Sequence, residues 1–165
     1  MNRAQAQQIF VYMLTVIVIG LILLLGSRYI FKIIDQMKQV DMVKFKTTLE
    51  QEATTYRSYG RWKNLEISVP GSIKEVCFVD TSQDAPAADN PFCQERRLLC
   101  DAWKDKTQNV ITEPFIVDTP IDIGDIKLKN PSTSNSYLCV PVVGGKIHVQ
   151  FAGGAQGKLE ISEWS

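Results

Sequence analysis

The residues with the clearest chemical potential are four cysteines, all of which lie after residue 76 of the 165-residue chain. They are Cys77, Cys93, Cys100 and Cys139, and no two of them form a C-x-x-C pair. Because His148 is the only histidine, a zinc site of ordinary ligand spacing is not supported. An even number of cysteines in a small domain is typical of disulfides formed in an oxidising compartment. Four buried thiols are the alternative interpretation.

Four cysteines allow three pairings, and their predicted positions favour one. Cys77 and Cys139 each fall within a predicted strand, so they can meet across a sheet or between core layers. Cys93 and Cys100 flank the start of a predicted helix, and a continuous helix would separate them by about 10 Å along its axis. That separation is too long for a disulfide unless the chain near 91–94 folds back. We therefore predict Cys77–Cys139 first and Cys93–Cys100 second.

His148 is the only candidate for a histidine base. It falls on the polar face of a predicted strand, where a solvated side chain is the simpler interpretation. No serine lies in a G-x-S-x-G motif, so a hydrolase triad is not supported. The sequence therefore predicts no catalytic residue, and the protein is not expected to be an enzyme.

Two further segments only superficially resemble ligand sites. The glycine-rich segment 153–158 has Ala152 where a phosphate-binding loop needs its first glycine, and Leu159 where it needs Ser or Thr. Asp118, Asp122 and Asp125 are close in sequence but lack the glycine and terminal glutamate of an EF-hand. We expect a turn and a solvated acidic stretch, with no metal and no cofactor.

The charge distribution is uneven although the formal net charge is zero. Residues 61–165 carry 11 basic and 14 acidic side chains, whereas residues 1–60 carry 7 basic and 4 acidic ones. A mildly acidic C-terminal region does not suit nucleic acid, which requires a basic patch. The positive N-terminal region suits anionic lipid headgroups, and a simple solvated helix is the alternative.

The N-terminal region contains a predicted transmembrane anchor over residues 1–27. No charged residue occurs from Ala4 to Ser27, and Ile9 to Gly26 is almost wholly apolar. A helix of this length spans a hydrocarbon core of about 30 Å. The apolar run exceeds the core of a secretory signal and no A-x-A site follows it, so we expect the anchor to be retained.

Two features of the sequence predict opposite sides of the membrane for the head. The flanking charges favour a cytoplasmic head, because only Arg3 and the amino group precede the apolar run while several basic residues follow it. The even set of cysteines favours an oxidising, extracytoplasmic space. We expect a cell-membrane protein with an extracytoplasmic head, and a cytoplasm-facing anchored domain remains the alternative.

A helical stalk is predicted over residues 28–60. Apolar residues recur at helical spacing and, after a phase slip near 41–43, the stripe continues to the C-terminal stop at Gly60. We expect one helix from about Gln5 to Tyr59. Lys46, Glu50 and Arg57 are expected to face water. The stripe consists of Ile30, Ile33, Ile34, Met37, Val40, Phe45, Leu49, Ala53 and Tyr56.

Residues 61–165 are predicted to form a small β-rich head. Alternating apolar positions predict strands, and a Gly-Gly pair at 144–145 predicts a hairpin. A short helix is expected over Pro91–Lys106, with Leu98, Leu99, Ala102 and Trp103 on its buried side. Polar loops are expected over 81–90 and 130–136. The fold class is α+β: one long N-terminal helix, half transmembrane and half amphipathic, with a mainly antiparallel head. The predicted strands are 65–69, 73–79, 115–117, 121–128, 137–143, 146–151 and 159–164.

The order of these parts resembles that of a type IV pilin or pilin-like protein. Residues 3–10, RAQAQQIF, are similar to the processing region of archaeal pilin-type signals. The resemblance implies cleavage after Arg3–Ala4 and before Gln5. Ile9 stands where pilins carry a glutamate that is thought to pair with a neighbour's N-terminus. The whole chain is also similar to archaeal single-pass membrane-anchored proteins of uncharacterised function.

Two classes of non-enzymatic function follow from this layout. The first is a structural or interaction protein, such as a pilin-like or cell-envelope subunit. The second is a tethered extracytoplasmic binding module that does not polymerise. The expected partners are the lipid bilayer and either like subunits or another envelope protein, with no nucleic acid. Trp164, near the C-terminus, is the candidate partner contact, and the sequence identifies no small-molecule ligand.

Overall fold

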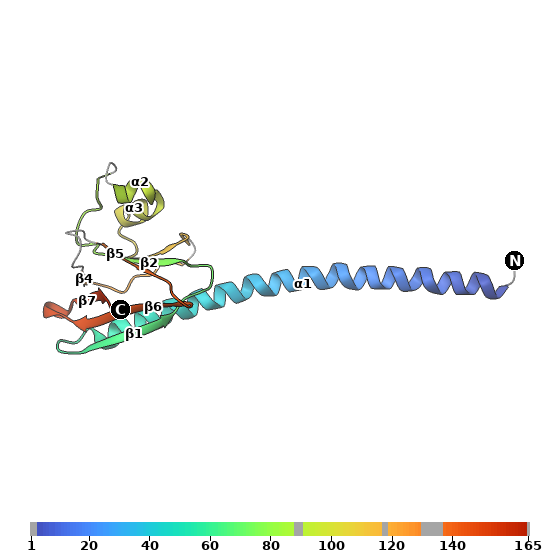
Figure 1. The fold of residues 1–165 in the computed structure, drawn as a ribbon, viewed down its shortest axis with the longest axis horizontal. Helices are drawn as coiled ribbons and strands as arrows, with labels where there is room; N and C mark the ends of the chain where they lie inside the picture. The colour runs from blue at the N-terminus through green and yellow to red at the C-terminus, as the bar shows by residue number, and fades with distance from the viewer. Residues whose placement is uncertain (1–2, 88–90, 117–118, 130–136, 165) are drawn as a thin grey trace. The chain divides into compact units, whose positions relative to one another are not determined.

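The computed structural model describes residues 3–87, 91–116, 119–129 and 137–164, apart from the side chains of residues 3–9, 34–35, 38 and 91–92. Within it, the chain separates into two compact units, Met1–Val40 and Asp41–Ser165. Both contain part of a single helix, α1, which extends from Arg3 to Tyr56 (Figure 1). The fold is α+β, as predicted: a long N-terminal helix accompanies a small, mainly antiparallel β head.

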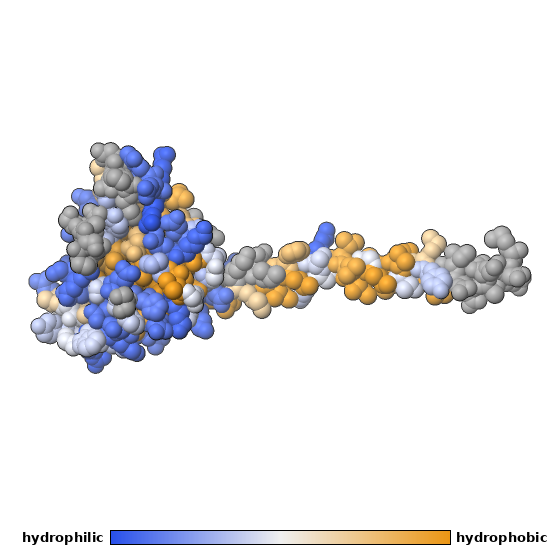
Figure 2. Space-filling model, viewed as in Figure 1, coloured by the Kyte–Doolittle hydropathy of each residue, from blue (hydrophilic) through white to orange (hydrophobic). Residues whose placement is uncertain are grey.

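The first unit consists of the N-terminal part of α1. Its segment Phe10–Ile33 is 24 residues long, and none of it is buried within the chain. Apolar side chains cover most of its visible face in Figure 2. The hydroxyl of Thr15 donates a hydrogen bond to the Val11 carbonyl at 2.8 Å, so its polar group is already paired. By length and composition, this segment is able to cross a membrane.

The second unit begins with the C-terminal turns of α1, which contribute one buried stripe to the head. Phe45, Leu49 and Ala53 are buried, as the spacing predicted. Met42 is also buried and extends this stripe by one turn, whereas Met37 and Val40, which precede the predicted phase slip, are exposed. A spacing of three or four residues keeps these side chains on one helix face, so this part of α1 is a core element of the head.

Two polar residues of α1 do not simply face water, contrary to the prediction. The Lys46 ammonium donates to the Pro120 carbonyl at 2.7 Å, and the Arg57 guanidinium donates to the Ile123 carbonyl. Both side chains therefore reach the segment that precedes β4. They satisfy backbone carbonyls there, which explains why long cationic side chains occur at these positions.

The larger sheet, sheet A, has the strand order β1-β6-β7-β4. The pairs β1–β6 and β6–β7 are antiparallel, and β4–β7 is parallel. The side chains of alternate residues point to opposite faces, so Leu65 and Ile67 of β1 are buried while their neighbours are exposed. The strands are β1 Trp62–Ser68, β4 Ile126–Leu128, β6 Lys146–Gly153 and β7 Leu159–Glu163.

The smaller sheet, sheet B, has the order β3-β2-β5 and is wholly antiparallel. One face contributes Val76, Phe78 and Val140 to the core that also contains the α1 stripe and the inner face of sheet A. Phe78 meets Phe151 of sheet A edge to face, with ring centroids 6.5 Å apart. The strands are β2 Glu75–Val79, β3 Val110–Glu113 and β5 Tyr137–Pro141.

The opposite face of sheet B supports a second apolar cluster. It is covered by α2, Pro91–Glu95, and α3, Arg97–Lys104, where a single helix was predicted. Leu98 was predicted to be buried but is 62% exposed. The helix break at Arg96 changes which side chains of α3 face the sheet. The cluster consists of Cys77, Val79, Cys93, Leu99, Cys100, Ala102, Trp103 and Ile111.

The predicted hairpin around Gly144–Gly145 is wrong as a strand pairing. A tight turn is present, with the isolated bridge Val143–Lys146. However, β5 pairs with β2 in sheet B, whereas β6 pairs with β1 and β7 in sheet A. The glycine pair therefore carries the chain from one sheet to the other. The glycine pair correctly predicted a reversal of the chain, but it could not predict which strands pair with each other.

Two other strand predictions were also inaccurate. Phe115 and Ile116 lie outside any strand, and β3 precedes them at Val110–Glu113. Of the predicted strand 121–128, only Ile126–Leu128 is a strand, and Ile121 makes an isolated bridge with Val110. The side chain of Asn109 binds the backbone here, donating to the Gly124 carbonyl and accepting from the Ile123 amide. These side-chain bonds replace a sheet ladder.

Gly153, at the end of β6, allows the strand to approach the end of α1. A Cβ atom there would collide with the Ser58 carbonyl oxygen and lie 2.9 Å from that of Tyr56. We expect Gly153→Ala to lower the free energy of unfolding by about 1–3 kcal/mol, because the crowding atoms are backbone. Gly71→Ala is the matched control, since no atom lies within 4 Å of its Cβ position. Equal urea midpoints for the two variants would contradict this close approach.

Candidate functional site

The most densely connected group of polar side chains lies between sheet B and the two short helices. Arg96 occupies the break between α2 and α3, and its guanidinium forms an ion pair with Glu75 at 2.8 Å. A second carboxylate, that of Glu113, lies 3.5 Å from the Arg96 Nε. Glu75 and Glu113 are directly opposite in the β2–β3 register. Since like charges opposite one another are destabilising, one guanidinium between them offsets the repulsion.

A disulfide lies beside this ion-pair group. Cys77 and Cys139 are directly opposite in the β2–β5 register and are bonded, with their Cα atoms 3.9 Å apart. The Arg96 Nη1 atom lies 3.2 Å from the Cys139 sulfur and 3.7 Å from the Cys77 sulfur. Arg96 therefore links the short helices to both the carboxylates and the disulfide of sheet B.

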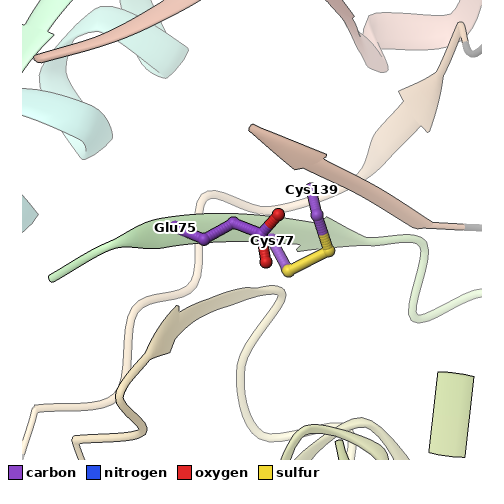
Figure 3. A group of neighbouring side chains, drawn as sticks. All are labelled: Glu75, Cys77 and Cys139. Atoms are coloured by element: carbon purple, nitrogen blue, oxygen red, sulfur yellow. A yellow bond between two sulfur atoms is a disulfide. The ribbon is translucent and has the colours of Figure 1, made fainter. Parts of the chain in front are cut away.

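The donor atoms of Glu75, Cys77 and Cys139 lie within 4.8 Å of one another, a spacing that would suit metal ligands (Figure 3). The two sulfurs are bonded to each other, however, and it is the thiolate that acts as the metal ligand. In this oxidised arrangement, the group fastens the helices to the sheet.

The second disulfide joins Cys93 and Cys100, with Cα atoms 5.5 Å apart. These two pairs are the ones favoured by the predicted positions of the cysteines. The short pair is possible because α2 ends at Glu95 and Arg96 has φ −129° and ψ 59°, outside helical geometry. This break removes the separation that a continuous helix would impose.

The two carboxylates Glu75 and Glu66 predict opposite pH effects. Burial raises the pKa of Glu75 against the opposing Arg96 charge, and a hydrogen bond and charge from Lys146 lower the pKa of exposed Glu66. The stability that folding gains from the raised pKa of Glu75 is complete below the pKa of this group in the unfolded chain, and it is lost as pH rises through the pKa in the folded protein. The stability gained from the lowered pKa of Glu66 is present above the pKa of that group in the unfolded chain, and it is lost as pH falls through the pKa in the folded protein.

We therefore expect the stability difference between wild type and Glu75→Gln to decline as pH rises from about 4 to 7. The difference between wild type and Glu66→Gln should instead decline as pH falls below about 4.3, the ordinary glutamate pKa. Urea denaturation at each pH measures both differences. Parallel profiles for the two variants would refute the assigned environments.

A shallow cavity of about 430 Å³ lies between the C-terminal part of α1 and the end of β1. Exposed Asp41, Lys44 and Glu66 contribute to its lining, as do Thr48 and Ser68. Its charges are mixed, and Glu66 is already held by Lys146 at 2.8 Å. This arrangement shows no preference for one ligand charge.

The outward side of sheet A carries a regular array of side chains, which we call the outer face. Two rows cross β1, β6 and β7, and a third ends at Trp164, directly after β7, because the register aligns alternate residues. In the last row, the His148 ring meets that of Trp164 edge to face at 5.4 Å. The rows are Trp62–Ala152–Glu160, Asn64–Gln150–Ser162 and Glu66–His148–Trp164.

The structure places the other described site residues on the outer face or in local turns. His148 is half-buried within the outer face, and Trp164 is half-buried, with an enclosed indole N–H that has no acceptor among the described residues. Asp122 accepts a hydrogen bond from the Gly124 amide at 2.9 Å, which closes a local turn. Segment 153–158 contains the short 3-10 helix η1, Ala155–Gly157, and leads into β7.

Some predictions fall beyond the described residues. Asp118 and the loop 130–136 lie outside the described residues, as do the side chains of Arg3, Ala4 and Gln5. The grouping of Arg96, Glu75 and Glu113 was not predicted, because no local sequence pattern brings a helix break to two separate strands. The polar members of the outer face alternate along each strand, but the pairing that aligns them in rows cannot be read from any one segment.

Comparisons with known proteins add no assignment: no family model, curated protein or solved structure matches this chain.

Proposed function

We propose that this chain is a membrane-anchored structural or interaction protein of the cell envelope, with a pilin-like subunit as the leading assignment. The observation that carries the proposal is that the two parts of α1 have different surroundings. Residues 10–33 are predominantly apolar and uncovered by the described chain, whereas Met42, Phe45, Leu49 and Ala53 are part of the head core. A helix built this way fastens a folded head to an apolar environment.

An extracytoplasmic head is supported by the two disulfides. The basic residues that follow the apolar segment favour the opposite orientation. Protease digestion of the head in intact cells distinguishes the two. An accessible head supports the envelope assignment, and a head cleaved only after lysis places the protein in the cytoplasm-facing class.

The pilin-like assignment concerns the apolar segment itself. In a filament, neighbouring helices would cover it; in a dispersed protein, lipid would. Sheared filaments containing chains that begin at Gln5 would support the subunit assignment. A dispersed membrane protein with its N-terminus at Met1 would support a tethered binding module instead, consistent with Ile9 in place of the usual glutamate.

Anchoring is tested by a charge at the centre of the apolar segment. We expect Ile17→Arg to reduce membrane retention, because a central arginine costs about 2.5–3.5 kcal/mol on insertion scales. Carbonate extraction followed by immunoblotting measures the retained fraction. Ile17→Leu is the matched control and should remain in the pellet. Parent protein found mainly in the soluble fraction would refute anchoring.

A further inference from the structure

The outer face of sheet A has a hydrogen-bonding pattern that orients its central row. The Ser162 hydroxyl donates to Gln150 Oε1 at 3.4 Å, and Gln150 Nε2 donates to Asn64 Oδ1 at 2.8 Å. This series of hydrogen bonds occupies the carbonyl oxygen of the Asn64 amide and so fixes the orientation of that amide. Its NH₂ group has no hydrogen-bond acceptor among the described residues, so two oriented donors remain available at an exposed position.

Charged groups at the margins of the outer face are paired within the chain. Glu66 is bound by Lys146 at 2.8 Å, and Glu160 is bound by Lys129 at 2.5 Å. These pairs leave amide, hydroxyl and imidazole groups as the polar groups between them. The face therefore favours a neutral, hydrogen-bonding ligand over an anion or a cation.

Aromatic rings lie at opposite corners of the same array. Trp62 is 66% exposed on edge strand β1, although an indole is more often partly buried. Trp164 follows β7 and contacts His148. Two strand spacings and four residues of strand rise place the two tryptophan positions roughly 16 Å apart. A ligand that reached both would have to be an extended chain rather than a single small ring.

We propose that the outer face of sheet A binds a neutral, extended oligosaccharide. A sugar ring presents an apolar C–H face and a rim of hydroxyl groups. The exposed indole of Trp62 suits the apolar face, and the free amide donors of Asn64 suit the hydroxyl oxygens. The imidazole of His148, in the next row, extends the polar track towards Trp164. In OB-folds, the exposed face of neighbouring strands likewise takes part in binding oligosaccharides.

This proposal rests on sheet A alone and does not require filament assembly. A dispersed, membrane-extracted protein would bind the sugar whether or not it polymerises. Failure of sugar binding would therefore leave the proposed anchoring and assembly untouched, and failure of assembly would leave sugar binding untouched.

The test uses the full chain in a detergent without a sugar headgroup. Cellohexaose, chitohexaose and maltohexaose are titrated separately while tryptophan fluorescence and binding heat are recorded. We expect at least one hexasaccharide to bind saturably with a Kd near or below about 1 mM. The corresponding monosaccharide should bind at least tenfold more weakly, because it cannot span the array.

Two variants locate the binding. Trp62→Ala should weaken binding about tenfold or more, as expected for an exposed aromatic anchor. Tyr59→Ala is the matched control, because Tyr59 is 83% exposed but lies before β1 and outside the array. Asn64→Gln, which keeps an amide but displaces it, should also weaken binding. Unchanged circular dichroism shows that each variant is folded.

Three results would overturn the proposal. The first is no saturable binding of any of the three hexasaccharides. The second is an equal loss of binding in Trp62→Ala and Tyr59→Ala. The third is concentration-dependent self-association, measured by sedimentation, that Trp62→Ala abolishes, since the face would then belong to a second copy of the chain.

Discussion

Replacing Leu49 with alanine is expected to lower the free energy of unfolding of the head by about 2–5 kcal/mol. Leu49 is fully buried and lies at the centre of the α1 stripe, between Phe45 and Ala53. Truncation leaves a cavity between α1 and the inner face of sheet A, because neighbours on a helix and a sheet relax only partly. The loss would be a large fraction of the stability of a domain of this size.

Urea denaturation of the full chain in detergent, followed by near-ultraviolet circular dichroism, measures this loss. The aromatic signal reports the head, where Trp103 is buried and meets Tyr137 edge to face at 6.3 Å. Val43→Ala is the matched control, because Val43 lies on the same helix but is 57% exposed. If both variants had the parent's midpoint, this part of α1 would not be a core element of the head.

Helical periodicity predicted the parts of the fold that depend on one segment alone. The α1 stripe was readable because Phe45, Leu49 and Ala53 repeat at three- or four-residue intervals, as side chains on one helix face must. The predicted phase slip near 41–43 is confirmed, because Met37 and Val40 before it are 62% and 65% exposed whereas Met42 after it is buried. Met42 therefore begins the buried stripe, at the edge of the core, where a flexible methionine side chain adapts well.

Strand partners could not be predicted in the same way. The turn at Gly144–Gly145 is local, but the choice of β2 for β5 and of β1 and β7 for β6 depends on the whole core. Likewise, Asn109 organises residues 123–124 through side-chain hydrogen bonds that resemble no strand pattern. Such strand pairings depend on local turn preferences and on burial against residues that are distant in sequence. A single sequence shows only the local turn preferences.

The Arg96 group illustrates a further limit. Its three charged members come from β2, β3 and the break between α2 and α3. No spacing in the sequence relates them. The break also brings Cys93 and Cys100 close enough to form a disulfide. The sequence indicated that this disulfide requires an interrupted helix, but it could not predict that the interruption forms.

Removing the Cys77–Cys139 disulfide is expected to have a larger effect on stability than removing the Cys93–Cys100 disulfide. The first closes a loop with a sequence separation of 62 residues and the second a loop with a separation of 7. In the chain-entropy model, these crosslinks stabilise by about 4 and about 2 kcal/mol, respectively, because a longer loop restricts the unfolded chain more. Paired alanine substitutions at each disulfide test this order.

The packing around the two disulfides also favours a larger effect on stability for Cys77–Cys139. Cys77 is fully buried beneath Arg96, and its disulfide joins two strands of sheet B that both contribute to the main core. Cys93 and Cys100 join only the two short helices. Urea midpoints of the two double-alanine variants, measured beside the parent without reductant, provide the comparison. A greater loss in the Cys93/Cys100 variant would mean that α2 and α3, rather than the β2–β5 crosslink, limit the stability of the head.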